Sequence, residues 1–235
     1  FGTKPIMQLP FEARNVAGLL SLQPGVTYAG SNTGADYRGG NVNGGKSDQA
    51  NITLDGVDVN DQQNRDPFTS VLRVTLDSVQ EFRVVTTNAN AELGRSSGAQ
   101  ISLVTKGGTN ELHGAAYEFL RNNKLDARNF FELSKAAPFR RNQYGASVGG
   151  PIKKDQLFFF GAYEYVNRSL VTGSQVITVK PADAQALGIS LPASGVIPAN
   201  QSVPFAFGKV DYQVTPNTLV TGRYFFFQNL SLSNI

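Results

Sequence analysis

The sequence changes character near residue 110, and this change limits the folds that the chain can adopt. Before it, the short apolar segments Phe82–Thr87 and Ala99–Lys106 are predicted to be strands, joined by a polar loop with Gly94 and Gly98. After it come longer, aromatic-rich segments separated by polar stretches. Because the side chains of a strand alternate between two faces, such segments predict strands with one apolar face. The sequence therefore predicts a compact α+β unit followed by a series of amphipathic strands.

The first half of the chain contains short elements. A helix is predicted from Glu12 to Leu22, because apolar side chains recur on one face at Val16, Leu19 and Leu20. Pro24 cannot continue this helix and ends it. Strands are also predicted at Ile6–Leu9, Tyr37–Arg38, Asn51–Leu54 and Val57–Val59. The short strand Tyr37–Arg38 lies within a Gly/Asn-rich loop predicted over Gly30–Gly45. A tight turn is predicted at Asp55-Gly56, and a short helix at Phe68–Leu76.

The second half predicts five strands of about ten residues each, the length that crosses a bilayer at a tilt. Their ranges are Leu112–Arg121, Asn142–Ile152, Leu157–Arg168, Phe205–Val214 and Leu219–Asn229. Tight turns are predicted at Lys153-Lys154-Asp155 and Thr215-Pro216-Asn217, whereas the Pro-containing segment Ser169–Pro204 is predicted to be a long loop. Connections that alternate between long and short are expected when one rim of a barrel carries loops and the other carries turns.

The last predicted hairpin has the clearest two-sided pattern. Its apolar positions are Val210, Tyr212, Val214, Val220, Tyr224 and Phe226, and its polar positions are Lys209, Asp211, Gln213, Thr221 and Arg223. A transmembrane barrel has this pattern, with apolar side chains toward lipid and polar ones toward the lumen. A half-buried antiparallel sheet of a soluble sandwich has the same period, so the hairpin alone leaves both interpretations open.

Composition excludes several classes of protein. With Cys 0, the chain has no disulfide scaffold and no thiolate metal site. A net charge of +3 without a Lys/Arg cluster gives no basis for binding nucleic acid. No apolar run is long enough for a transmembrane helix, although barrel strands escape such a search.

No catalytic or metal-binding constellation is predicted. The one histidine, His113, stands at the start of a predicted strand with no nucleophile beside it. Asp55, Asp58 and Asp61 follow the spacing D-x-x-D-x-x-D, which differs from the calcium loop of an EF-hand. Asp55 is better explained as part of a turn with Gly56. We therefore expect neither an enzyme nor a resident metal or cofactor.

Five motifs follow one another along the chain: LPFEARNVAGLLSLQPGV at 9–26, Arg38-Gly39, ITLDGVDVND at 52–61, SVQEFRVVTTNANAELGRSSGAQISLVTKGGTNELHGAAYEFLRN at 78–122 and FGKVDYQVTPNTLVTGRYFFF at 207–227. In this order they resemble the motifs of TonB-dependent outer-membrane receptors, and of the Oar-like group in particular. The resemblance implies an α+β plug domain at 1–110, followed at 111–235 by antiparallel transmembrane β-barrel strands, the first five of about 22. The TonB box and most of the barrel are then expected to lie outside this chain.

The same resemblance implies a location, a function and partners. The location is the cell outer membrane, and the function is energy-coupled uptake of a large or scarce substrate. The implied partners are the inner-membrane energy-coupling protein TonB, outer-membrane lipid and a small-molecule, glycan or peptide substrate, such as a siderophore. No cofactor and no nucleic acid are implied. The alternatives are a non-transporting outer-membrane adhesion or assembly protein with the same barrel, and a soluble two-domain β-rich binding protein.

One family feature is only half present. Commoner receptors of this class carry Arg-Gly-Pro where this chain has Thr86-Thr87-Asn88, and that arginine resembles part of a charged clasp against acidic residues of the barrel wall. The second clasp arginine matches Arg38, which is therefore predicted to contact the barrel. Whether Arg83 or Arg95 substitutes for the missing one is left open.

Substrate contacts are predicted on a polar plug loop. The residues are Asn60, Asp61, Gln62, Asn64 and Arg65, a dense run of hydrogen-bonding side chains after two short strands. Loops on a rigid base often carry binding residues. The alternative is that the loop is a solvated connection or a contact with the barrel wall.

Overall fold

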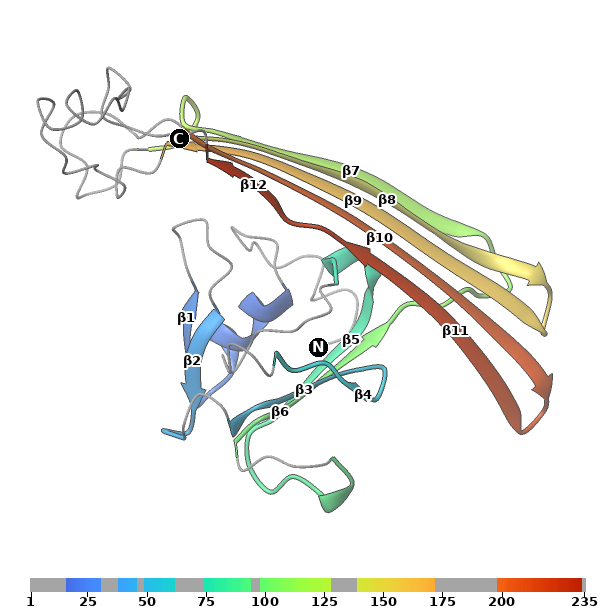
Figure 1. Ribbon diagram of the computed structural model, residues 1–235. Helices are drawn as coiled ribbons and strands as arrows, with labels where there is room; N and C mark the ends of the chain where they lie inside the picture. Colours follow the sequence, from blue (N-terminus) through green and yellow to red (C-terminus); the bar gives the residue numbers. More distant parts are fainter. Residues whose placement is uncertain are drawn as a thin grey trace, which may run out of the picture. The chain divides into compact units, whose positions relative to one another are not determined.

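The computed structural model describes residues 16–30, 38–45, 49–61, 74–93, 98–127, 139–171 and 198–233. The chain forms two compact units. The first comprises Phe1–Gly114, Ser147–Ala162 and Phe207–Phe225, and the second comprises Ala115–Ala146, Tyr163–Ala206 and Phe226–Ile235. Strands dominate the part of the chain that is described (Figure 1). Over those residues, none of the helices has the length and apolar character needed to cross a membrane.

A four-stranded sheet with the order β4-β3-β6-β5 forms the centre of the first unit. Its strands are β3 (Asn51–Leu54), β4 (Val57–Asp58), β5 (Val79–Val85) and β6 (Gln100–Thr105). The central strands β3 and β6 are parallel, whereas β4 and β5 pair antiparallel at the edges. The predicted strand Asn51–Leu54 is confirmed at both ends, and the predicted Asp55-Gly56 turn has positive φ angles at both residues.

The two faces of this sheet differ in polarity. One face is buried in an apolar core through side chains such as Ile52, Phe82 and Leu103. The 3-10 helix η1 (Val16–Leu22) adds Leu19 and Leu20, which are almost fully buried. Other core residues come from the ends of the strands and from the 3-10 helix η3 (Leu76–Ser78). The opposite face carries polar side chains, because positions along a strand alternate between faces.

The predicted helix Glu12–Leu22 is a 3-10 helix over the residues that are described, and not an α-helix. Its residues 12–15 lie outside the described part of the chain, and the rest is a 3-10 helix. The Ser21 hydroxyl donates to the carbonyl of Gly18 at 2.7 Å, and the Gln23 amide donates to Leu20 at 3.0 Å. The Gln23 bond joins backbone groups three residues apart, the spacing of the tighter helix, which is common in short segments. The apolar face was nevertheless predicted correctly.

In the first half of the chain, one further prediction is corrected, and two others concern residues outside the described ranges. The Gly/Asn-rich stretch predicted as a loop around Tyr37–Arg38 contributes a full strand, β2 (Arg38–Val42), which pairs antiparallel with β1 (Val26–Gly30). Backbone pairing across small residues such as Gly40 needs no β-branched side chain, so the sequence pattern is weak here. The predicted strand Ile6–Leu9 and nearly all of the predicted helix Phe68–Leu76 lie outside the described residues.

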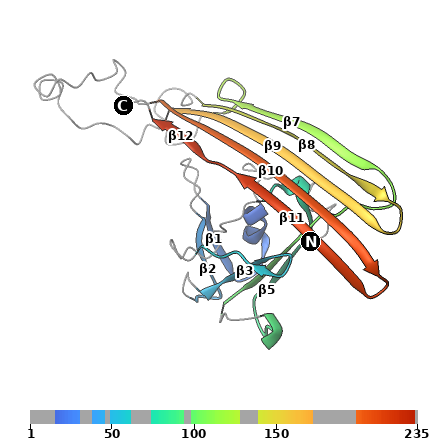
Figure 2. The same ribbon diagram turned by 45° about the vertical axis from the view of Figure 1, so that its right-hand side comes forward.

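The remaining strands form one antiparallel sheet with the order β11-β10-β9-β8-β7, and β12 also pairs with β10 (Figure 2). Their bounds are β7 (His113–Asn122), β8 (Phe139–Lys153), β9 (Leu157–Val171), β10 (Pro198–Thr215), β11 (Thr218–Phe227) and β12 (Leu230–Ser233). Strands therefore follow one another across the sheet in chain order, as the predicted hairpins require. The predicted tight turns after Lys153 and Thr215 are confirmed.

The predicted strand length of about ten residues is wrong for the middle of this sheet. Strands β8 and β9 have 15 residues each, and β10 has 18. Strand β10 begins at Pro198, inside the segment predicted as a loop up to Pro204. Proline lacks the backbone donor that a central strand needs, so sequence rules end a strand there. In the structure Pro204 lies opposite the break between β11 and β12, where its carbonyl accepts from the Gln228 amide at 3.2 Å.

The predicted alternation of the last hairpin is confirmed. The side chains of Val210, Tyr212 and Val214 are 41–44% exposed, whereas those of Lys209 and Asp211 are only 12% and 15% exposed. Other large exposed apolar residues of this sheet are Phe119, Leu120, Tyr144, Val148, Ile152, Tyr163, Leu219, Val220, Tyr224, Phe226 and Leu230. Such a broad apolar surface is uncommon on a soluble monomer.

Candidate functional site

An acidic side chain at the end of strand β3 organises the polar contacts of the first unit. The Asp55 carboxylate accepts a hydrogen bond from the Thr105 amide at 2.8 Å through Oδ1 and one from the Thr105 hydroxyl at 2.7 Å through Oδ2. The same Oδ2 forms an ion pair with Nη1 of Arg223 at 3.1 Å. The Asp55 side chain is 7% exposed, so its negative charge is neutralised where water has little access.

A second cation stands beside this ion pair. Lys209 donates from Nζ to the Thr105 hydroxyl at 3.4 Å and lies 3.8 Å from Oδ2 of Asp211. Asp211 in turn accepts from the Thr221 hydroxyl at 2.6 Å. We call these six residues, Asp55, Thr105, Lys209, Asp211, Thr221 and Arg223, the ionic cluster. It joins the ends of β3 and β6 to the polar face of β10 and β11.

Aromatic packing adjoins the ionic cluster. Phe225, two residues after Arg223 on the same face of β11, packs against the apolar core of the first unit. Its ring stacks on Phe207 with centroids 4.6 Å apart, and Phe207 lies 6.0 Å from Phe160. The polar face of β10 and β11 is therefore apolar in one place, next to the charged contact.

The segment after β6 is fixed to the turn between β8 and β9. The Asn110 side chain donates to the Asp155 carboxylate, and the Asp155 amide donates back to Oδ1 of Asn110 at 2.8 Å. Burial lowers the pKa of Lys106 from its ordinary value, and the nearby Asp77 carboxylate opposes that shift. The Lys106 amide is bonded to the Ser78 carbonyl at 2.8 Å, so this segment is held at both ends.

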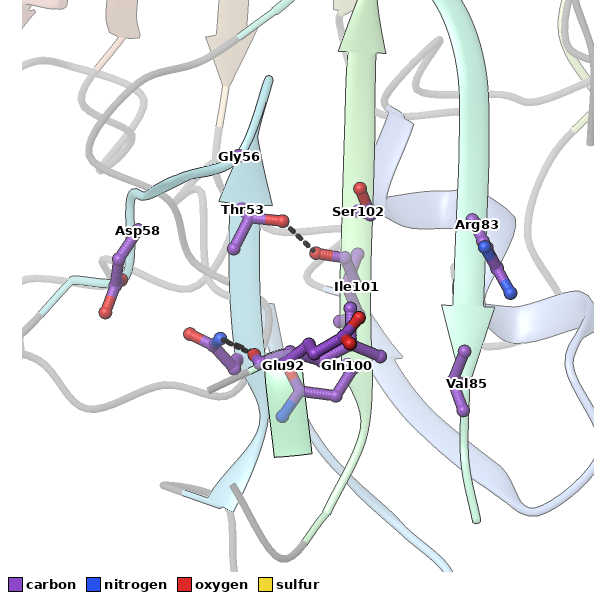
Figure 3. A pocket seen from close by; sticks show the side chains of 11 residues that line it. Thr53, Gly56, Asp58, Arg83, Val85, Glu92, Gln100, Ile101 and Ser102 are labelled. Carbon is purple, nitrogen blue, oxygen red and sulfur yellow. Dashed lines mark hydrogen bonds between the residues drawn. The ribbon is translucent and has the colours of Figure 1, made fainter. Parts of the chain in front are cut away.

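A pocket of about 620 Å³ lies on the polar face of the four-stranded sheet (Figure 3). Strands β3, β5 and β6 contribute side chains that include Thr53, Arg83 and Ser102, and the 3-10 helix η4 (Ala91–Leu93) contributes Glu92. The Thr53 hydroxyl donates to the carbonyl of Ile101 at 3.4 Å. The other lining residues are Asn51, Gly56, Asp58, Val85, Leu93, Gln100 and Ile101.

Gln100 is the pocket residue with unused hydrogen-bonding capacity. Its Oε1 accepts from Asn51 Nδ2 at 3.0 Å, which orients the amide. The residue is 5% exposed, and its Nε2 has no hydrogen-bond partner among the described residues. Buried amide donors are usually satisfied. Arg83 lines the same pocket, so its guanidinium is a donor that the pocket presents, whereas Gln100 Nε2 is itself buried.

Two family models match consecutive parts of the chain. The TonB-dependent receptor plug domain matches residues 7–99, and an outer membrane β-barrel domain matches residues 104–206. The chain thus carries a plug domain of the TonB-dependent receptor type, followed by part of an outer membrane β-barrel domain. Strands β3, β4 and β5 lie within the plug match, and β7, β8 and β9 lie within the barrel match. We refer to the four-stranded sheet with its core as the plug and to β7–β12 as the barrel strands. In an outer-membrane barrel, the broad exposed apolar face is the one expected to face lipid.

Individual relatives agree with this family. The TonB-dependent transporter Oar of Myxococcus xanthus is 29% identical over 160 residues, which are 64% of this chain and 14% of Oar. The siderophore receptor PirA from Acinetobacter baumannii matches 99% of this chain with 31% of its own, at 20% identity and a TM-score of 0.68. The outer membrane transporter YddB from Escherichia coli matches 97% with 33% of its own, at 13% identity and a TM-score of 0.70. The chain thus spans a third or less of these relatives, and the two solved structures show the shared fold.

The predicted substrate residues are only partly described in this receptor. Asn60 and Asp61 follow β4, whereas Gln62, Asn64 and Arg65 lie outside the described residues. The Asn60 side chain bonds within the plug: Oδ1 accepts from the Ile52 amide at 3.0 Å, and Nδ2 donates to Asn51 at 2.6 Å. Nδ2 also lies 2.6 Å from Oδ1 of Asp58. The role of this loop in substrate binding stays a prediction.

Residue identity alone did not reveal the ionic cluster. Asp55 was explained only as a turn residue, and Arg223 only as a residue facing the lumen. Their separation in the sequence gives no signal that they meet. Arg38, the predicted contact with the barrel, is the first residue of β2, and its contact stays a prediction.

We expect Asn60→Ala to destabilise the plug. The change removes the bonds of the Asn60 side chain to Ile52 and Asn51, and leaves a buried amide of β3 without its acceptor. Each such loss costs about 1–3 kcal/mol. The midpoint of thermal unfolding of the detergent-purified receptor should fall. Thr87→Ala, at an exposed position of the same unit, is the control, and an equal fall for both variants would contradict the assignment.

Proposed function

We propose that this receptor takes up a large or scarce substrate by energy-coupled movement of its plug. The observation that carries the proposal is the ionic cluster. The plug has an apolar core of its own, and its contact with β10 and β11 at Asp55 is made by one ion pair and one hydrogen bond, beside the packing of Phe225. Polar contacts exchange for contacts with water, so breaking them costs much less than opening an apolar core.

The proposal includes the partners of such a cycle. A barrel in the outer membrane has no energy source beside it, so work on the plug must come from a protein of the inner membrane, which we identify as TonB from the family. The barrel strands contact outer-membrane lipid through their apolar face. The substrate is a small molecule, glycan or peptide. PirA is a siderophore receptor by name, which makes ferric siderophores the first compounds to test.

Uptake by cells that carry the full-length receptor tests this function. Radiolabelled ferric siderophores, cobalamin, oligosaccharides and peptides are offered to cells with an intact energy-coupling complex and to cells without it. We expect one class to accumulate inside the first cells and to fall at least about tenfold in the second. Binding to the cell surface should be the same in both.

Absence of energy-dependent uptake would favour the alternative function, a non-transporting adhesion or assembly protein. An adhesion or assembly protein that uses the same barrel would accumulate none of these compounds, and its attachment to surfaces or to other cells would not depend on the energy-coupling complex. That result would overturn the proposal of uptake while leaving the family assignment unchanged.

A further inference from the structure

We propose that Arg223 holds the plug in its resting position through Asp55, as a clasp whose polarity is the reverse of the one expected from the family. The expected clasp has arginine on the plug and an acid on the barrel. In this chain the acid is on the plug and the arginine is on barrel strand β11. The inference deepens the proposed function, because it names the contact that movement of the plug must break.

The plug prepares Asp55 as an acceptor before any barrel residue takes part. Asp55 has a φ of 48°, which turns the chain sharply after β3. Two donors of Thr105, its amide and its hydroxyl, fix the carboxylate by one bond to each oxygen. A carboxylate that is held in place loses little further freedom when a cation binds, so the contact with Arg223 is favoured.

Arg223, rather than Lys209, is the partner of this carboxylate. Nη1 of Arg223 lies 3.1 Å from Oδ2 of Asp55. Lys209 instead contacts the Thr105 hydroxyl and lies near Asp211. Within the ranges that the structure describes, Arg223 is the cation ion-paired with Asp55. The two basic residues of the ionic cluster therefore have different roles.

The clasp can be opened as well as closed. The Arg223 side chain is 27% exposed, whereas that of Asp55 is 7% exposed. Water can thus reach the guanidinium and replace the carboxylate as its partner when the plug moves. An ion pair that was buried on both sides would leave an uncompensated charge at that moment, which is far more costly.

The position of the clasp gives it control over the plug sheet. Asp55 directly follows β3, and Thr105 is the last residue of β6, the parallel neighbour of β3. One cation on the barrel therefore fixes the same end of both central strands. Any displacement of these strands relative to β11 has to separate Asp55 from Arg223.

Conductance of the full-length receptor in planar lipid bilayers tests the clasp without substrate and without TonB. We expect Arg223→Gln to raise the frequency of open-channel events about tenfold, because the closed state loses a charged contact. Arg223→Lys keeps the charge and should stay within about threefold of the unchanged receptor. Lys153→Gln removes an exposed cation from the end of strand β8, outside the ionic cluster, and should also stay within about threefold.

A double-mutant cycle assigns the effect to this pair. Asp55→Asn keeps an oxygen for the Thr105 amide but removes the charge, and should open the channel as Arg223→Gln does. The double variant should be no leakier than either single variant if both remove one contact. Assembly of each variant is checked by its heat-dependent mobility on gels.

The proposal is overturned if Arg223→Gln does not leak, or if Lys153→Gln leaks as much as Arg223→Gln. In the first case Asp55 acts only inside the plug. In the second case, loss of any positive charge from the barrel sheet has the same effect. Neither measurement involves uptake. Conductance can therefore contradict the clasp while energy-coupled uptake is still observed, and uptake can be absent while conductance supports the clasp.

Discussion

Replacing Val210 or Tyr224 by arginine will greatly reduce the amount of receptor that assembles in the outer membrane. Val210 is 42% exposed and Tyr224 is 68% exposed, both on the apolar face of β10 and β11, which we propose faces lipid. An arginine on the lipid side of a barrel costs about 2–4 kcal/mol near the middle of the bilayer. At about 1.4 kcal/mol for each factor of ten, this corresponds to a shift of roughly thirty- to a thousandfold.

Two alanine substitutions on the opposite face serve as controls. Lys209→Ala and Arg223→Ala remove polar side chains that face away from lipid, so the variants should reach the membrane at normal levels. Arg223→Ala should still differ from the unchanged receptor in conductance, through loss of the clasp. The measurement is the amount of folded, heat-modifiable receptor in outer-membrane fractions. Equal loss of receptor in both pairs of variants would show that the two faces are assigned wrongly.

Local sequence patterns predicted those parts of the fold that depend on neighbouring residues. Strand β3 was predicted with its true bounds, because an apolar segment ends there at Asp55-Gly56, a strong turn signal. The faces of β10 and β11 were predicted because polar and apolar side chains alternate from Lys209 to Val214 and again from Val220 to Tyr224, before Phe225 breaks the pattern. In both cases the information lies within about ten residues, which is the range of these rules.

The rest depends on partners far away in the chain. The β1–β2 hairpin is held by backbone pairing through small residues such as Gly39 and Gly40, so its stability comes from the opposite strand and not from side-chain pattern. The start of β10 at Pro198 was missed because its pairing with β12 outweighs the usual effect of proline. The ion pair of Asp55 with Arg223 could not be predicted, since either residue alone fits many ordinary roles.

Gly108 will tolerate no side chain, and Gly108→Ala should be the most damaging small substitution in the segment after the plug. A Cβ added here would lie 2.4 Å from the carbonyl oxygen of Phe159 and 2.6 Å from that of Gly150. It would also lie 2.8 Å from the Phe159 amide nitrogen. All three atoms belong to the backbone of β8 and β9, which cannot retreat without breaking the hydrogen bonds of the barrel sheet.

The segment would therefore have to lift away from the barrel strands. That movement would strain the paired bonds between Asn110 and Asp155, which fix the segment to the turn after β8. We expect a cost of at least about 2 kcal/mol from overpacking and lost contacts. The midpoint of thermal unfolding of the detergent-purified receptor should fall by several degrees, as it does for changes of this size.

Gly208→Ala and Gly222→Ala are matched controls for this prediction. Both glycines lie in barrel strands, and a Cβ added at either would meet no heavy atom within 4 Å. Each control adds the same methyl group to the same receptor. A lower unfolding temperature for Gly108→Ala than for the controls is therefore due to the close approach of the backbones at Gly108. If all three variants unfold at the same temperature, the segment has room to move. The fixed connection between the plug and the first barrel strands would then have to be abandoned.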